Sequence, residues 1–280
     1  MTRVVLITGC RSGFGLETAK LAGERGWTVY AGLRDVTTDA NLRAATEGLD
    51  VRPLQLDITV DGDRMAAIDR IRAEVGRLDA LVNNAGRGLA GFLELVEEDE
   101  MRDLFEVNVI GGWAVTQQAL PLMRESGGTH IVQVSSTSGL TAIPGLGAYA
   151  GTKFAVEGMG EAWRHELALF GIRFSLVEPG AYATDIFDRN RRVCRRASDP
   201  GPYEPWAAGA QELFENAVKK IARDPREVAE KILEILDDPD PSFRNPIGPT
   251  SAVRHVVKRA VPFALVEAVM RKALNRARKG

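Results

Sequence analysis

Short apolar runs alternate with longer amphipathic segments along most of the chain. Continuous apolar runs are typical of strands in a parallel sheet that is covered on both faces. The clearest run lies at residues 3–8, and further strands are predicted at 28–33, 51–56, 80–82, 130–134 and 172–177. Apolar positions at helical spacing follow at residues 16–25, 68–75, 97–123, 154–170, 211–221 and 225–236. A proline-rich connection at 239–249 is expected to hold a short final strand.

A glycine-rich loop follows the first apolar run. Gly9, Gly13 and Gly15 stand in the pattern T-G-x-x-x-G-x-G between the predicted strand and the predicted helix, with Ser12 and Phe14 among them. Glycines let the backbone approach a pyrophosphate, and a helix N-terminus supplies N–H groups and partial positive charge. The pattern therefore predicts a dinucleotide site. The alternative is a tight turn with no ligand.

The end of the second predicted strand carries information on the choice between NAD and NADP. An acidic residue there would accept hydrogen bonds from the ribose 2′-hydroxyl and repel a 2′-phosphate. Leu33 holds that position and Arg34 follows it, while Arg11 in the glycine loop is a second cation. Two guanidinium groups favour a 2′-phosphate through charge-assisted hydrogen bonds. We therefore expect NADP(H), with NAD(H) less favoured and Asp35 as the contrary feature.

Three further strand ends are candidates for cofactor contact. Asp57 and Ile58 close the third strand, where the carboxylate could meet an adenine edge or cap the helix that starts near Asp61. Small residues follow the fourth strand as Asn84-Ala85-Gly86, which fits backbone packed on a cofactor or a plain turn. After the sixth strand come the remaining cofactor-site candidates, Pro179, Gly180 and Thr184.

The stretch around Ser136 carries the candidate chemistry. Tyr149 and Lys153 are four residues apart, so they share one face of a helix. A nearby ammonium is expected to lower the pKa of the phenol, which would make it a usable acid and base. Ser136 precedes Tyr149 across a loop and could polarise a carbonyl or carbinol oxygen. Each residue alone has an ordinary structural explanation, as a helix-surface pair or a turn serine.

Composition narrows the function classes. The chain has 280 residues, 45 % hydrophobic, 26 % charged, with a net charge of −2, which indicates one large α/β domain and no global attraction to nucleic acid. The two cysteines, Cys10 and Cys194, form neither a metal cluster nor a disulfide framework, which suggests a reducing, cytoplasmic setting. We expect no metal, no signal peptide and no membrane-spanning run.

Together these motifs resemble the short-chain dehydrogenase/reductase family, over about residues 3–184. The cofactor loop, the Asn83–Gly86 motif and the Pro179-Gly180 turn stand in the family's order. Asn108 joins Ser136, Tyr149 and Lys153 at the family's catalytic tetrad positions. The residues around Cys10 and Arg34 look most like the 17β-hydroxysteroid and retinol dehydrogenase branch, which largely uses NADP. Two departures are of packing size: Phe14 replaces isoleucine, and Gly151-Thr152 replaces Ala-Ser.

The resemblance implies a single doubly wound Rossmann domain with a parallel sheet of about seven strands, helices on both faces, a helical lid and C-terminal helices. It implies interconversion of a secondary alcohol and a ketone or aldehyde, with Tyr149 as acid/base and Lys153 on the ribose. By resemblance, Asn108 holds a water that links Lys153 to solvent; from its residue type alone it is a satisfied buried amide. The family usually forms dimers or tetramers through the helices that carry Asn108 and Tyr149.

We assign residues 1–250 to this domain, with a lid at about 183–222. The lid could instead be a disordered surface loop. Apolar side chains in the lid and after Gly86 suit a small steroid, retinoid or lipid-like substrate, or a self-packed lid. They are Leu89, Phe92, Leu93, Phe187, Tyr203 and Trp206. A non-catalytic NADP-binding regulator is the alternative function, but the complete tetrad argues against it.

Residues 251–280 form a basic extension that carries eight basic residues and one acidic residue, or +7, so the rest of the chain carries −9. Pro262 is expected to divide it into two helices. In the second helix Val266, Val269, Met270 and Ala273 share one face. We expect this helix to pack on the same domain. The alternative is contact with an anionic membrane surface.

Overall fold

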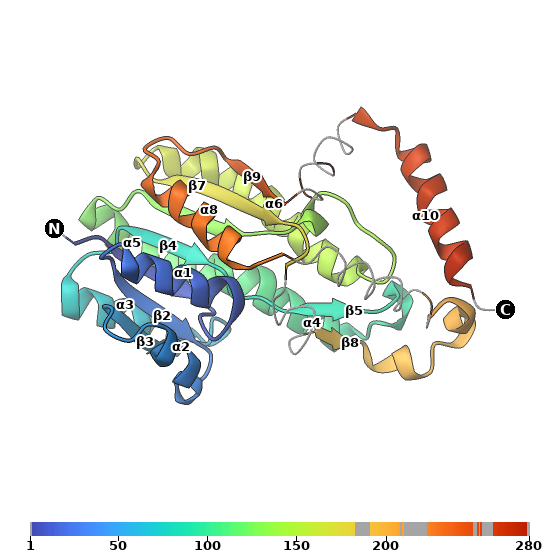
Figure 1. Ribbon diagram of the computed structural model, residues 1–280, viewed down its shortest axis with the longest axis horizontal. Coiled ribbons are helices and arrows are strands. Elements are labelled where there is room, and N and C mark those ends of the chain that lie inside the picture. The colour runs from blue at the N-terminus through green and yellow to red at the C-terminus, as the bar shows by residue number, and fades with distance from the viewer. Residues whose placement is uncertain are drawn as a thin grey trace.

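A seven-stranded parallel sheet runs through the centre of the protein (Figure 1). The computed structural model describes residues 2–182, 191–207, 209, 223–248, 251, 253 and 260–278. The strands of the sheet are β1 (Val4–Thr8), β2 (Thr28–Leu33), β3 (Val51–Gln55), β4 (Ala80–Asn83), β6 (His130–Val134), β7 (Arg173–Pro179) and β9 (Arg244–Ile247). Their order is β3-β2-β1-β4-β6-β7-β9, and all pairings are parallel. This confirms the predicted fold class, including the final strand.

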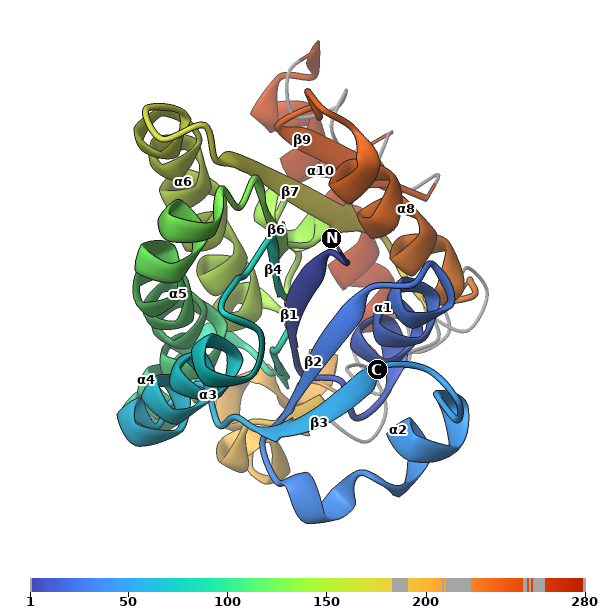
Figure 2. The ribbon, with the colours of Figure 1, turned by 90° about the vertical axis from the view of Figure 1, so that its left-hand side faces the viewer.

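Helices cover both faces of the sheet (Figure 2). Helices α1 (Gly13–Glu24), α2 (Ala40–Ala45) and α8 (Arg226–Asp237) lie on one face. The other face is covered by α3 (Asp61–Val75), α4 (Glu98–Phe105), α5 (Gly112–Ser126) and α6 (Gly147–Ala168). Every residue of β1 and β2 is buried, as the continuous apolar runs predict.

The sequence predicts one long helix from residue 97 to about 123. In the structure this helix is interrupted around Asn108. A π-helical turn, Glu106–Gly111, joins α4 to α5. Gly111 allows Ile58 to pack against this turn, since a Cβ there would lie 2.8 Å from the Ile58 Cγ1. Turns of this kind are frequent at functional sites because they redirect the side chains that they carry.

The described part of the predicted lid is packed onto the domain. Strand β8 (Arg191–Val193) pairs in parallel with β5 (Gly88–Ala90), which follows the Asn84–Gly86 turn. Cys194 is buried in a small apolar cluster, and Tyr203 stacks on Phe92 with ring centroids 4.6 Å apart. Residues 191–207 therefore form an ordered segment packed over β5 and Phe92, which we call the cover. The predicted helix at 211–221 lies outside the described residues.

The C-terminal helix α10 (Phe263–Ala277) begins directly after Pro262, as predicted. It stands away from the sheet and touches the cover at its C-terminal end, where Arg278 lies 5.4 Å from the Trp206 ring centroid (Figure 1). Of the predicted inward face, Val266 and Met270 are partly buried, but Val269 is 63 % exposed. Among the described helices, none has the length and apolar character needed to cross a bilayer.

Candidate active site

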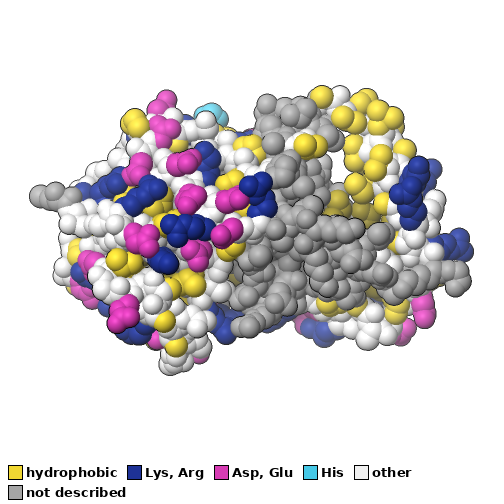
Figure 3. Space-filling model, in the orientation of Figure 1, with side chains coloured by type: hydrophobic (Ala, Val, Ile, Leu, Met, Phe, Trp, Pro, Cys, Tyr) yellow, Lys and Arg dark blue, Asp and Glu magenta, His cyan; other side chains and the backbone are white. Residues whose placement is uncertain are grey.

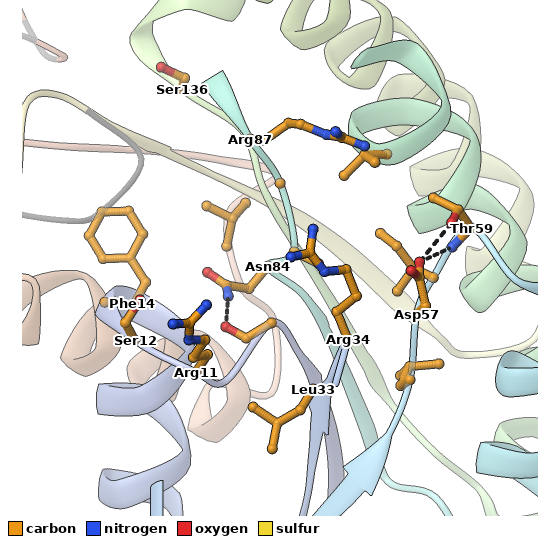
Figure 4. A pocket seen from close by; sticks show the side chains of 18 of the residues that line it. Arg11, Ser12, Phe14, Leu33, Arg34, Asp57, Thr59, Asn84, Arg87 and Ser136 are labelled. Carbon is orange, nitrogen blue, oxygen red and sulfur yellow. Dashed lines mark hydrogen bonds between the residues drawn. The ribbon is translucent and has the colours of Figure 1, made fainter. Parts of the chain in front are cut away.

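A cleft lies at the carboxyl edge of the sheet, and residues at the ends of six strands line it (Figure 4). Its volume is about 820 Å³, within the usual range for ligand sites. Most of the predicted cofactor residues line it: Gly9, Arg11, Ser12, Gly13, Phe14, Arg34, Asp57, Ile58, Asn84, Ala85, Gly86, Pro179 and Gly180. Ser136, Tyr149 and Lys153 line the same cleft. The described residues contain no cluster of three or more potential metal ligands.

Close backbone packing explains the spacing of the glycine loop. Gly9 and Gly13 have φ of +74° and +59°, which side chains rarely tolerate. A Cβ on Gly15 would lie 2.4 Å from the Gly9 carbonyl oxygen. The Asn84 side chain donates hydrogen bonds to the Thr8 and Gly9 carbonyls at 2.9 and 3.1 Å. Asn84 therefore holds the loop in place.

One arginine lies in the glycine loop before α1 and another directly after β2. Arg11 and Arg34 both line the cleft, as does Asp35. The Asp35 carboxylate accepts hydrogen bonds from the Thr37 backbone N–H at 3.0 Å and its hydroxyl at 2.6 Å. These hydrogen bonds from Thr37 lower the pKa of Asp35. Asp35, the residue that speaks against NADP, therefore forms hydrogen bonds within its own turn.

The carboxylate of Asp57 is likewise engaged locally. It accepts hydrogen bonds from the Thr59 N–H at 2.9 Å and from the Thr59 hydroxyl at 2.7 Å (Figure 4). This is a turn of the Asx type, which leads into α3. The predicted cap on the helix is therefore wrong in its partner, because the carboxylate bonds Thr59 and the N-cap of α3 is Val60. The adenine contact stays a prediction.

Asn108 ties two walls of the site together. Its side-chain oxygen accepts from the Arg87 N–H at 2.9 Å, and its amide donates to the Arg87 carbonyl at 2.9 Å and to Thr152 at 3.1 Å. Asn108 is 3 % exposed. Thr152, one of the departures from the family pattern, donates to the Tyr149 carbonyl at 2.7 Å. Among the residues described, Asn108 does not line the cleft, so its amide acts as a structural tie.

Ser136 and Tyr149 come together from β6 and α6. The Ser136 hydroxyl accepts a hydrogen bond from the Ser138 N–H at 3.1 Å, which caps a short turn. Burial raises the pKa of Tyr149 to about 12, and a hydrogen bond with Ser136 partly opposes the rise. The predicted lowering of the phenol pKa is therefore wrong for this structure. Desolvation of the phenolate on burial is the main cause of the raised pKa.

Lys153 lies one turn after Tyr149 on α6. Its Nζ is 5.8 Å from the Tyr149 ring centroid and donates to the Val134 carbonyl at 3.0 Å. Burial lowers the pKa of Lys153 to about 8, and the charge of Glu157, one turn further along α6, opposes this shift. A buried lysine with such a pKa can exchange a proton near neutral pH.

Lys153→Met is expected to stabilise the fold. The pKa of Lys153 falls from 10.5 to about 8 on burial, so the charged lysine opposes folding most strongly below pH 8. At pH 7 the variant should gain about 3–4 kcal/mol of unfolding free energy, because the pKa falls from 10.5 to about 8 and one pKa unit corresponds to about 1.4 kcal/mol. The gain should shrink as pH rises through this window and vanish near 10.5. Denaturant unfolding across this pH range measures it.

Lys231→Met is the control, since Lys231 is a partly exposed surface lysine paired with Glu234. It should change stability by less than about 0.5 kcal/mol at either end of the range. A Lys153→Met variant that is less stable than the wild type at neutral pH would contradict the burial argument.

Phe14 and Tyr182 close one end of the cleft. Their rings meet edge to face, with centroids 5.5 Å apart, which accounts for phenylalanine at a position where isoleucine is expected. The Tyr182 hydroxyl donates to Glu227 at 3.3 Å, and Gly180 donates its N–H to the Ile247 carbonyl at 3.0 Å. Thr184, also predicted here, lies outside the described residues.

A cluster of two arginines and one aspartate lines the cleft and was missed in the sequence. Arg87 forms two hydrogen bonds to Asp103, at 2.6 and 2.8 Å, and Arg192 reaches the same carboxylate at 3.2 Å. Burial is the main cause that lowers the pKa of Arg87, with Arg192 and Arg34 adding to it. Arg87 directly follows Gly86, but no local signal pairs it with residues so distant in the chain.

The predicted apolar walls of the substrate site pack mainly on one another. Leu89 is buried beside Cys194, and Phe92 stacks on Tyr203. Neither these residues nor Leu93 and Trp206 line the described cleft, and Phe187 lies outside the described residues. The interpretation of this segment as a self-packed cover is the one that the described part favours.

Comparison with known proteins identifies the family. A model described as short chain dehydrogenase matches residues 3–194. The chain belongs to the short-chain dehydrogenase/reductase family. It is 33 % identical over 247 residues to 3-ketodihydrosphingosine reductase of Bacteroides thetaiotaomicron, covering 88 % of each chain. It is 36 % identical over 255 residues to human 17-beta-hydroxysteroid dehydrogenase type 1, covering 86 % of this chain and 76 % of that protein.

Solved structures of family members have the same fold. A short-chain dehydrogenase from Streptomyces avermitilis is 32 % identical, with a TM-score of 0.82 over 97 % of this chain and 99 % of that one. A family member from Burkholderia phymatum in complex with NAD has a TM-score of 0.77 at 25 % identity, covering 95 % of each chain. ElxO with NADP bound has a TM-score of 0.71 at 25 % identity, over 88 % of this chain and 96 % of that one.

The cleft of this short-chain dehydrogenase suits a nicotinamide dinucleotide. The glycine loop meets the N-terminus of α1, where an anion is favoured, and arginines flank that position. The three candidate catalytic side chains lie along the same cleft. The protein is thus a nucleotide-binding oxidoreductase of this family.

Proposed function

We propose that the protein is an NADP(H)-dependent oxidoreductase of the EC 1.1.1 class, interconverting a secondary alcohol and a ketone or aldehyde. The observation that carries the proposal is the convergence of Ser136, Tyr149 and Lys153 on the cleft that also holds the glycine loop. A regulator that only binds the cofactor would not require these three groups together.

In the reductive direction, the Tyr149 hydroxyl donates a proton to the substrate oxygen and Ser136 donates a hydrogen bond to it. When bound, the reduced nicotinamide supplies the hydride. Lys153 holds the ribose hydroxyls and supplies positive charge beneath the phenol. Asn108 holds the Arg87 backbone next to α6 through its hydrogen bonds to Arg87 and Thr152. We also propose that Asn108 holds a water that links Lys153 to solvent.

An apolar, lipid-like substrate is proposed, of the steroid, retinoid or fatty ketone type. The names of two relatives refer to a keto-sphingoid base and a hydroxysteroid. A panel of such ketones and alcohols, followed by cofactor absorbance, tests the proposal. Turnover of roughly 1–1,000 per second on one of them would support it, and the absence of turnover across ketones, aldehydes and alcohols would count against the activity.

Preference for NADP over NAD is proposed from Arg11 and Arg34. Arg34→Leu is expected to raise KM for NADPH by about 10–100-fold, because a hydrogen bond to a charged group is worth about 1.5–3 kcal/mol. KM for NADH should change little. Steady-state kinetics with both cofactors measures the ratio.

Arg43→Leu removes a comparable arginine that is exposed, pairs with Asp39 on α2 and does not line the cleft. It should leave both KM values near those of the wild type. If Arg34→Leu affected NADPH and NADH equally, the assigned 2′-phosphate site would be wrong.

A homodimer or homotetramer is proposed through α5 and α6. Ile110, Trp113 and Phe154 are 45, 40 and 40 % exposed on this side of the domain. Light scattering tests this arrangement, since a monomer at micromolar concentration would exclude it. The two cysteines, both free and buried, support the proposed cytoplasmic location, which fractionation of the cells can test.

A further inference from the structure

Helix α10 carries two different apolar stripes. Val266, Met270 and Leu274 are partly buried at spacings of four, and Ala277 is 3 % exposed. The C-terminal end of this stripe faces the protein. A Cβ on Gly209 would lie 2.0 Å from the Ala277 carbonyl oxygen, so the two backbones pack closely there. The helix is therefore attached to the domain, and its outward side needs a separate explanation.

The outward stripe is apolar in the first half of the helix and basic in the second half. Leu265 and Val269 are 59 and 63 % exposed. Phe263, at the start of the helix, is 79 % exposed, but it lies two residues before Leu265 and so points away from this stripe. Lys272 and Arg276 continue the line of Leu265 and Val269 at spacings of three and four. Figure 3 shows hydrophobic side chains gathered on the upper part of α10 and basic side chains further down.

Charge on this segment is one-sided. The described helix and its next residue carry Arg271, Lys272, Arg276 and Arg278 against one acid, Glu267, which pairs with Arg271. The extension as a whole carries +7 on a chain whose net charge is −2. By contrast, acidic and basic side chains are mixed over the body of the molecule in the same view (Figure 3).

The charge and the exposed apolar residues together indicate which partner could bind the outward stripe. A second copy of the helix would bring the same basic charges, so its pairing would be opposed by repulsion or would set basic groups on apolar ones. An acidic protein surface would satisfy the cations but leave Leu265 and Val269 in a polar contact. Anionic lipid offers an apolar layer beneath a negatively charged surface, which satisfies both parts.

We propose that α10 binds the surface of an anionic lipid bilayer, with Leu265 and Val269 inserted among the acyl chains. Lys272 and Arg276 contact the headgroups. The helix lies on the bilayer, at the end of the molecule where the cover of residues 191–207 is found (Figure 1). This inference stands apart from the proposed catalysis, because lipid binding needs neither cofactor nor substrate.

Pelleting of the full-length protein with vesicles tests the proposal. Vesicles of equal parts phosphatidylcholine and phosphatidylglycerol should carry the protein down at low salt, and pure phosphatidylcholine should bind it about tenfold less. High salt should release most of it because the electrostatic attraction is screened. Wild-type protein that stays in the supernatant with anionic vesicles would overturn the proposal.

Two double variants separate the parts of the stripe. Leu265→Ser with Val269→Ser, and Lys272→Glu with Arg276→Glu, should each lower binding about tenfold or more. The matched control is Met65→Ser with Leu169→Ser, since these residues are 52 and 82 % exposed on the body of the domain. It should bind like the wild type. Circular dichroism and the unfolding midpoint confirm that each variant is folded.

Equal binding by the apolar double variant and the wild type would exclude α10 as the lipid-binding element. A change in oligomer mass in that variant, with no vesicle binding by the wild type, would instead assign the stripe to a second copy of the chain. Carbonyl reduction measured without vesicles keeps the two questions distinguishable, since it reports on the cleft alone.

Discussion

Tyr149→Phe is expected to lower turnover by about 10²–10⁴-fold, the usual contribution of a general acid or base. The hydroxyl is the only group removed, and the ring is 3 % exposed and packed, so the fold should persist. The dissociation constant for NADPH should stay near that of the wild type. Single-turnover kinetics and cofactor fluorescence measure the two quantities.

Tyr182→Phe provides a control within the same cleft. Its hydroxyl is directed to Glu227 on α8, 3.3 Å away. This variant should keep most of the turnover. Equal losses in the two variants would point to a general disturbance of the cleft, and full turnover in Tyr149→Phe would remove the tyrosine from the mechanism.

Arg244→Met is expected to destabilise the fold by about 3–5 kcal/mol, the usual effect of removing one partner of a buried ion pair. Arg244 on β9 lies 3.0 Å from Glu157 and 3.6 Å from Glu178, whose side chains are 6 and 0 % exposed. The substitution removes the cation from two buried carboxylates, whose desolvation then lacks this compensation. Equilibrium unfolding in denaturant measures the change.

Arg226→Met is the matched control, because its ion pair with Glu230 is 43 and 50 % exposed. Such a pair contributes about 0–1 kcal/mol. Adding Glu157→Gln to Arg244→Met should recover part of the stability, since one buried charge is then absent. Losses of similar size in Arg244→Met and Arg226→Met would show that the cluster contributes little.

The Arg244 cluster also bears on the candidate site. Glu157 follows Lys153 by one turn of α6, and Glu178 directly precedes Pro179 and Gly180 on the cleft wall. A Cβ on Gly139 would lie 2.9 Å from the Glu157 Cγ and 3.0 Å from the Ser135 hydroxyl. Arg244 on β9 therefore holds together two elements that form the cleft, α6 and β7, so its loss should also impair turnover.

Local patterns in the sequence determined most of the fold and the position of the site. Buried parallel strands are mostly apolar, so β1, β2 and β6 could be recognised without their neighbours. The glycine loop and the Tyr149–Lys153 pair depend on spacing within one turn or one helix. Because parallel strands end at one edge of the sheet, residues that follow these strands were expected to meet there.

Tertiary structure decided the features that depend on distant partners. The raised pKa of Tyr149 comes from burial, which many segments produce together. Arg87 meets Asp103 of α4, and Arg192 reaches the same carboxylate because the chain folds β8 against β5. The sequence also indicated an amphipathic α10, but not which of its stripes would face the protein. Burial and long-range pairing sum contributions from residues far apart in the chain, so local spacing alone could not reveal them.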